Sequence, residues 1–339
     1  MSTTPAAVEP DQPAQAPWWQ RFVGGSSAPI GLILIGLIVV FSVLEYENFV
    51  SVSNGRNITT DAAVLLVLAV GSTFVIVTAG IDLSVGSVLV FAGVAAAKAM
   101  EQVGGESVGT LLVGLVAALA SGLAWGVLNG FLIAKAKIPA LIVTLGSLGM
   151  ALGAALLITG GVDQRDVPFK LVETVGSGRL FGELPYLVLI AFAVALAGGI
   201  LLAATRFGRY TYAIGSNEEG ARRAGVAVDR HLIKVYALSG TLAGLAGYLS
   251  LARFATTTIG GHSTDNLQAI AAIVIGGTSL FGGVGTMLGT VFGVFIPAVL
   301  QNGFVIVGLQ PFWQQVAVGA VLIIAVYLDQ LRRRSNYQR

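Results

Sequence analysis

The stretch AAVLLVLAVGSTFVIVTAGI, residues 62–81, contains no charged residue and lies between Asp61 and Asp82. A transmembrane helix needs about 20 consecutive, mostly apolar residues to cross the hydrocarbon core of a bilayer. Residues 62–81 therefore predict a helix that spans a membrane.

The whole chain has the composition that this stretch suggests. Hydrophobic residues make up 55% and charged residues 11% of the 339 positions, and the mean hydropathy is +0.85. Ordinary soluble domains are about a quarter charged. We therefore predict an all-α, polytopic membrane protein embedded in lipid. The net charge of +2 is too small to indicate nucleic-acid binding, and the absence of cysteine excludes disulfides and thiol catalysis.

Uncharged runs set the expected number of crossings. A shorter run, 82–98, is long enough if Lys98 extends its amine to the interface. The long run 265–329 divides into three at the glycines of 282–285 and between Gln301 and Pro311. Together with six runs that each hold one helix, these predict about ten transmembrane helices. The six runs lie between residues 21 and 45, 61 and 82, 106 and 135, 137 and 163, 183 and 206, and 234 and 253.

The distribution of Lys and Arg predicts the orientation. With ten crossings and a cytoplasmic N-terminus, 13 basic residues fall inside and six outside, as the positive-inside rule requires. Both termini should then be cytoplasmic. We predict a Pro-rich disordered cytoplasmic tail over residues 1–24, a single transmembrane domain over 25–330 and a basic cytoplasmic tail over 331–339.

The chain offers little that could power transport. Asp82, Lys98 and Arg253 lie near predicted helix ends, and His231 and His262 are predicted in loops. Ion-coupled carriers use ionisable groups deep in the membrane, and ATP binding needs a phosphate-binding loop such as G-x-x-x-x-G-K-[ST], which is absent. We predict no catalytic residue, no metal site and no cofactor bound by this chain, so uphill transport would require a partner.

The longest cytoplasmic loop, residues 206–234, contains a helix signature. Ser216 and Glu219 fit a capping box, Arg222 and Arg223 suit the C-terminal end, and Gly225 can end the helix. This pattern predicts a short helix outside the membrane. An ordinary solvated loop is the alternative that local sequence leaves open.

Several blocks, in this order along the chain, resemble one family. They are TAGIDLSVGSV (78–88), AIGSNEEGARRAG (213–225), LSGTLAGLAG (238–247), AIAAIVIGGTSL (269–280) and PFWQQ (311–315). The chain resembles the permeases of bacterial ABC importers of the ribose, xylose and galactose type, over nearly its whole length.

The resemblance implies an architecture and a set of partners. It implies a ten-helix permease with the type II fold of the vitamin B12 importer, in the bacterial inner membrane among its lipids. A second copy of the permease, an ABC ATPase with two fused nucleotide-binding domains that holds ATP and Mg, and an extracytoplasmic sugar-binding protein are the implied partners. No nucleic acid is expected.

The resemblance also assigns a coupling helix, which contacts the ATPase, to the loop between the sixth and seventh helices. That assignment covers Ser216, Asn217, Glu218, Glu219, Gly220, Ala221, Arg222, Arg223, Ala224 and Gly225.

Candidates for the translocation path follow from the related fold, in which the fifth helix and the short helix after it border the passage. They are Thr144, Ser147 and the segment 163–173. Asp82 is either a gate at a helix break or a cap of the next helix, and we favour the cap; Ser84 is likewise a cap or a packing group.

A departure from the family concerns the outer rim. The family has Glu-Leu-Asp before its Ala-Ile-Ala run, whereas this chain has Asn266-Leu267-Gln268, preceded by Asp265. We predict that Asp265, Asn266 and Gln268 help to dock the binding protein. Two rival functions stay open: a permease for branched-chain amino acids, and an ion-coupled secondary carrier or channel that needs no ATPase.

Overall fold

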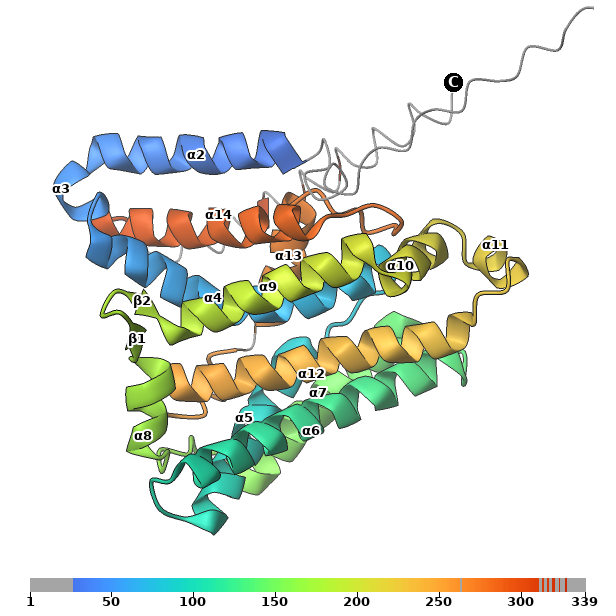
Figure 1. The fold of residues 1–339 in the computed structure, drawn as a ribbon, viewed down its shortest axis with the longest axis horizontal. Coiled ribbons are helices and arrows are strands. Elements are labelled where there is room, and N and C mark those ends of the chain that lie inside the picture. Colours follow the sequence, from blue (N-terminus) through green and yellow to red (C-terminus); the bar gives the residue numbers. More distant parts are fainter. Residues whose placement is uncertain are drawn as a thin grey trace, which may run out of the picture.

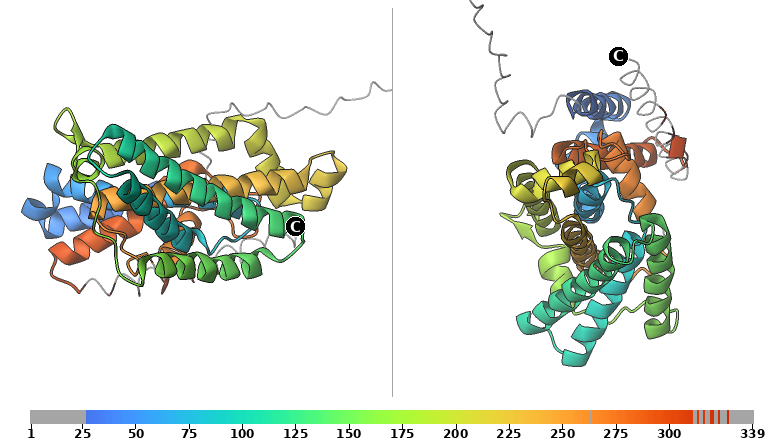
Figure 2. Two further views of the ribbon diagram at one scale, coloured as in Figure 1. Left: turned by 90° about the horizontal axis from the view of Figure 1, so that it is seen from below. Right: turned by 90° about the vertical axis from the view of Figure 1, so that its right-hand side faces the viewer.

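The computed structural model describes residues 27–262 and 264–310, and six isolated positions between 313 and 327. Within these residues, seven helices are long and apolar enough to cross a membrane, and they run side by side as one bundle (Figures 1 and 2). These helices are α4 (Val52–Val77), α5 (Val85–Val103), α6 (Val108–Ala134), α7 (Ala140–Thr159), α9 (Tyr186–Ala204), α12 (Val228–Phe254) and α14 (Met287–Ile306).

Shorter elements connect and flank the bundle. Two are apolar, α2 (Ser27–Leu44) at its edge and α13 (Asp265–Ile275). The others are α3 (Tyr46–Phe49), α8 (Phe169–Leu171), the π-helical turn η1 (Val172–Gly176), α10 (Arg206–Ser216) and α11 (Glu218–Arg223), with the antiparallel strands β1 (Arg179–Leu180) and β2 (Leu184–Pro185).

Each of the first nine predicted spans contains one of these helices. Three differ clearly from the prediction in length. Helix α4 begins at Val52, because the Ser51 side chain caps its N-terminus by accepting from Asn54 N–H at 3.1 Å. Helix α12 begins at Val228, before Lys234, and α13 has only 11 residues. The tenth predicted span and both predicted tails lie outside the continuously described residues. The polytopic membrane class is confirmed.

Helix α4 forms the centre of the bundle. Of the 18 most apolar consecutive residues of α4, 89% are buried, whereas only 28% are buried in the corresponding stretches of α6 and α7. Helices α9, α12, α13 and α14 all pack against it. The residues from Leu66 to Thr78, in the second half of α4 and just after it, are buried.

Glycines bring α6 and α12 into backbone contact. A Cβ on Gly122 would lie 2.2 Å from the carbonyl oxygen of Gly240, and one on Gly240 would lie 2.3 Å from that of Gly122. Such close approach is how membrane helices pack where lipid supplies no hydrophobic drive. Gly149 on α7 has no atom within 4 Å of its Cβ position.

We expect Gly240→Leu to destabilise the bundle and Gly149→Leu to be tolerated. The first inserts four carbons into a backbone contact, and overpacking costs about 1–3 kcal/mol or more, while the second adds the same side chain to open space. Thermal denaturation in detergent, followed by size-exclusion chromatography, measures both. Equal midpoints for the two variants would show that the glycine contact contributes nothing.

Candidate functional site

The chain is not helical between α4 and α5, and this break lies among packed helices. Helix α4 ends at Val77, where Ala79 takes a φ of 62° and Gly80 N–H donates to Val75 O at 3.0 Å. Beyond the break, α5 begins at Val85. We call residues 78–84 the re-entrant segment. Non-helical backbone at membrane depth is tolerated only where protein or a polar cavity surrounds it.

Asp82 is the charged residue of the re-entrant segment and is only 3% exposed. Its Oδ1 accepts from Ser84 N–H at 3.0 Å and from Ser84 Oγ at 2.6 Å. Its Oδ2 lies 3.5 Å from Ser239 Oγ on α12. The bond to Ser84 N–H just before α5 resembles the capping role that the sequence favours, and the burial of Asp82 adds a polar centre inside the bundle.

The hydrogen bonds continue from Ser84 across two more helices. Ser84 Oγ accepts from Asn129 Nδ2 of α6 at 2.9 Å, and Asn129 Oδ1 accepts from Ser147 Oγ of α7. Thr144 Oγ1 donates to Ala140 O at 2.9 Å and lies 3.3 Å from Ile81 O. We call Asp82, Ser84, Asn129, Ser147 and Ser239 the polar cluster.

The polar cluster brings together three of the four predicted path residues, with Thr144 beside them. Sequence reasoning missed Asn129 and Ser239, although an amide inside the apolar run 106–135 is a visible signal. All five residues of the cluster are buried in the single chain, and each is at most 3% exposed. The cluster can bind, orient and relay hydrogen bonds, but it presents no open surface in this conformation.

The predicted short helix is present as α11, with one correction to its start. Asn217, not Ser216, is the N-cap, and its Oδ1 accepts from Gly220 N–H at 2.7 Å. Ser216 is instead the last residue of α10, an 11-residue helix within the stretch predicted as a loop. At the other end Gly225 has a φ of +83° and Val226 N–H donates to Ala221 O at 3.0 Å.

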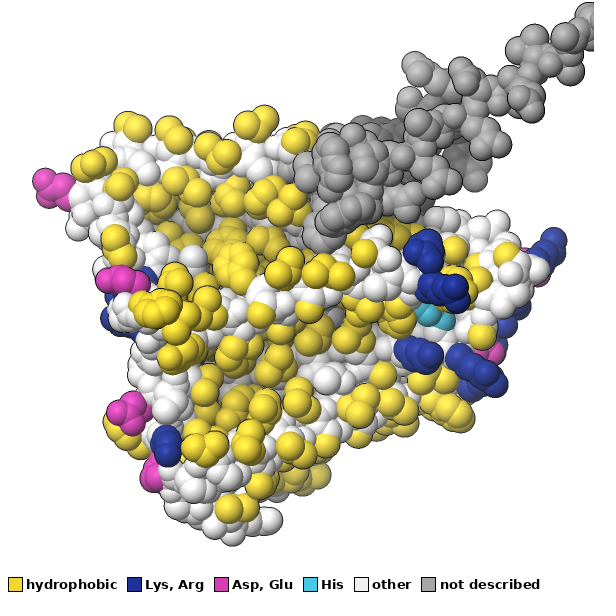
Figure 3. All heavy atoms as spheres, in the orientation of Figure 1, with side chains coloured by type: hydrophobic (Ala, Val, Ile, Leu, Met, Phe, Trp, Pro, Cys, Tyr) yellow, Lys and Arg dark blue, Asp and Glu magenta, His cyan; other side chains and the backbone are white. Residues whose placement is uncertain are grey.

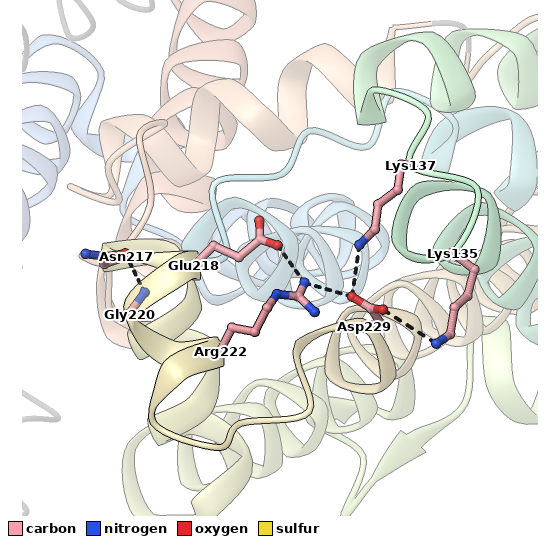
Figure 4. Close-up of polar contacts among 7 residues, drawn as sticks. All are labelled: Lys135, Lys137, Asn217, Glu218, Gly220, Arg222 and Asp229. Carbon is pink, nitrogen blue, oxygen red and sulfur yellow. Dashed lines mark hydrogen bonds and ion pairs between the residues drawn. The ribbon is translucent and has the colours of Figure 1, made fainter.

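A charge network fixes α11 to the loop between α6 and α7 (Figure 4). Asp229 accepts from Arg222 at 2.9 Å and from Lys137 at 3.0 Å, and lies 3.5 Å from Lys135. Arg222 also pairs with Glu218 at 3.1 Å. Lys and Arg side chains gather at this end of the molecule (Figure 3), which agrees with its assignment to the cytoplasmic side.

The end of α10 packs against the end of α4. Gly283 N–H donates to Val77 O at 2.9 Å, and a Cβ on Gly215 would lie 1.8 Å from the same carbonyl oxygen. Tyr212 Oη donates to Gly285 O at 2.6 Å, and burial raises the pKa of Tyr212 to about 12, so this donor keeps its proton at physiological pH. The segment that carries α11 therefore contacts the start of the re-entrant segment.

The residues predicted at the outer rim lie at the opposite end of the bundle. Asn266 is 6% exposed and its Nδ2 donates to Leu83 O at 2.9 Å, so its side chain faces inward, unlike the prediction. Asp265 lies 2.6 Å from Nδ1 of His262, and Gln268 is partly exposed. His231, predicted in a loop, lies in the first turn of α12, where Thr211 Oγ1 is 2.9 Å from its Nε2.

Seven helices long and apolar enough to cross a membrane, packed around a buried polar cluster, define a multi-pass membrane protein among the described residues. The family model described as "Branched-chain amino acid transport system / permease component" matches residues 54–326. The chain belongs to this family of permease components.

Similar proteins cover nearly the full chain. The ribose import permease protein of Escherichia coli is 38% identical over 309 residues, 89% of this chain and 93% of that protein. The fructose import permease protein of Rhizobium meliloti is 33% identical, over 93% of this chain and 88% of its own. The galactose/methyl galactoside import permease protein of Escherichia coli is 34% identical, over 89% and 94%. No solved structure matches the chain.

Proposed function

We propose that this protein is the membrane-spanning subunit of an ATP-driven importer of a monosaccharide. The observation that carries the proposal is the similarity to ribose, fructose and galactose import permeases over about nine-tenths of each chain. In this proposal the chain forms the passage and hydrolyses no ATP, and a separate ATPase and a sugar-binding protein complete the importer.

The proposed assembly has ten crossings per chain, cytoplasmic termini, the type II fold and two copies of the permease around the passage. Nine helices match predicted spans, and these support the number. A tenth crossing would make the count even and would place most Lys and Arg residues on one side of the membrane. ATP and Mg would bind to the ATPase subunit.

In the proposed mechanism α11, with its flanking residues Ser216 to Gly225, docks on the ATPase. Its exposed ion pairs, Glu218 with Arg222 and Glu219 with Arg223, leave a charged surface for a protein partner. Movement of α11 would reach Val77 and the re-entrant segment through the packed glycines 215 and 283. A ligand shifts such a two-state equilibrium only by binding its states unequally, and here ATP and the loaded binding protein supply that difference.

In this proposal the polar cluster supports the wall of the passage and does not line it. Its donors are arranged in one direction, from Ser147 through Asn129 and Ser84 to Asp82, which fixes the break between α4 and α5. We propose that this break is where the bundle changes shape, with Thr144 and Ser147 on the helix nearest the passage. Asp265 and Gln268 remain our proposed contacts for the binding protein.

The description of the family favours one other substrate class, branched-chain amino acids. Uptake of radiolabelled ribose, fructose, galactose and leucine by cells that express the permease with its ATPase and binding protein separates the two. We expect uptake of one sugar and none of leucine, and the sugar uptake should depend on the permease gene. Leucine uptake without sugar uptake would reject the sugar proposal.

A further inference from the structure

A pocket opens at the end of the bundle opposite α11, between α4, α12, α13 and α14. Its volume is about 360 Å³, within the range of sites for small molecules. A stable interface with a folded partner buries about 800 Å² on each side, so this pocket suits a small molecule better than a protein surface. Its polar lining residues are Thr60, Asp61, Arg253, His262, Asp265, Gln268, Gln301 and Asn302.

An ion pair on the pocket wall supplies hydrogen-bonding groups, and Asp265 adds a second carboxylate to the lining. Arg253 Nη2 lies 2.6 Å from Asp61 Oδ1, and the two side chains are 31% and 58% exposed. A guanidinium has five N–H donors and a carboxylate several lone pairs, so the pair retains donors and acceptors that face solvent. The guanidinium can donate to a hydroxyl oxygen and the carboxylate can accept from a hydroxyl group, so adjacent hydroxyls of one ligand can use both members.

The remaining lining is amphipathic. The ring of Phe254 is 51% exposed beside the amides of Gln268 and Gln301. A monosaccharide has the matching character, with C–H groups on its faces and hydroxyls around its edge. Binding sites for small ligands combine apolar walls with a few placed polar groups in this way.

The floor of the pocket is held firmly and touches the re-entrant segment. His262 is fixed by Ser250 Oγ, 2.6 Å from its Nε2, and by Asp265 Oδ2, 2.6 Å from its Nδ1. A Cβ on Gly86 would lie 3.0 Å from the His262 carbonyl oxygen, and Asn266 bonds to Leu83 O. The pocket is therefore preformed, and its floor is continuous with the backbone that carries Asp82.

We infer that this pocket is a reception site where the permease itself holds a neutral monosaccharide, in contact with Asp61, Arg253 and Gln268, after the binding protein releases it. This inference rests on the proposed function and adds a substrate site within the permease. Because the sugar must move on, the site should bind weakly, in the millimolar range.

Saturation-transfer NMR on the full-length chain in lipid nanodiscs tests the site with D-ribose, D-fructose and D-galactose in turn. For a sugar that binds wild type, we expect Arg253→Ala to weaken binding about tenfold, the effect of losing a hydrogen bond to a charged group. Gln268→Ala, a milder change at a partly exposed amide, should weaken it less. Glu101→Gln removes an exposed pair outside the pocket, with Lys98 at 2.8 Å, and should leave the signal unchanged.

Two results would overturn the reception site: no signal from any of the three sugars with wild type, or equal signals from wild type, Arg253→Ala and Gln268→Ala. Capture of the sugar-binding protein by the same variants forms a second readout. If Arg253→Ala loses that protein while its sugar signal is intact, the pocket is a docking surface and the inference is wrong. Sugar uptake by cells without any NMR signal would reject the site and leave the proposed function standing.

Discussion

Combining Glu219→Arg with Gly225→Pro should reduce ATP-driven uptake about tenfold or more, the scale of a lost allosteric coupling, without unfolding the bundle. Gly225 has a φ of +83°, and proline is restricted to about −65°, so α11 cannot end where it does. Glu219→Arg removes the pair with Arg223 at 3.1 Å and places a cation at a helix N-terminus. Uptake into proteoliposomes that contain the ATPase and binding protein measures the loss.

A matched control exists at the end of α5. Glu101→Arg with Gly104→Pro alters an exposed acid and a glycine with a φ of +69° that follows a helix, as at α11. Equal losses of uptake in the two double variants would show that the effect comes from general damage to the protein.

Contact between α11 and the ATPase can be measured directly by cross-linking, because the chain has no cysteine and Ala224→Cys places a single thiol on the exposed segment after α11. A cross-link to the ATPase is expected from that position.

The second large effect concerns Asp82. We expect Asp82→Ala to lower the yield of folded protein strongly, since it leaves the N–H and hydroxyl of Ser84 without their buried acceptor. Each orphaned buried group costs about 1–3 kcal/mol. Asp82→Asn should keep near-normal yield and uptake, because an amide oxygen can still accept from Ser84 and no ion pair with Asp82 exists among the described residues to be broken.

Thermal denaturation and uptake should be compared for both Asp82 variants. Glu47→Ala removes an exposed carboxylate before the bundle and should change neither quantity. If Asp82→Asn lowers thermal stability and uptake as much as Asp82→Ala does, the negative charge itself is required. That result would favour an ion-binding role and, with it, the secondary-carrier alternative.

The sequence predicted where the membrane helices lie because long uncharged runs are local signals, although α4, α5 and α12 extend past the charged residues that bound those runs. It also predicted α11, since the caps and the glycine that stop a short helix are local signals. The N-cap was displaced by one residue, from Ser216 to Asn217, because both residues can cap and the choice depends on how far α10 extends. Local patterns carry no information on that extent.

The depth of Asp82 could not be read from the sequence. A charge between two apolar runs ordinarily lies at the membrane surface, but here the chain turns back into the bundle and Asp82 ends 3% exposed. Its partners on α6, α7 and α12 are 45 to 157 positions apart from the re-entrant segment in the chain, so only tertiary packing unites them. The inward orientation of Asn266 has the same origin, as its partner is Leu83.

In our proposal, a partner ATPase docks on α11 and drives transport through the permease. This proposal is tested most directly by sugar uptake into proteoliposomes that contain either the permease alone or the permease with its ATPase, both loaded with ATP and supplied with the sugar-bound binding protein. We expect accumulation of the sugar only when the ATPase is present. Accumulation by the permease alone, driven by an ion gradient, would contradict it.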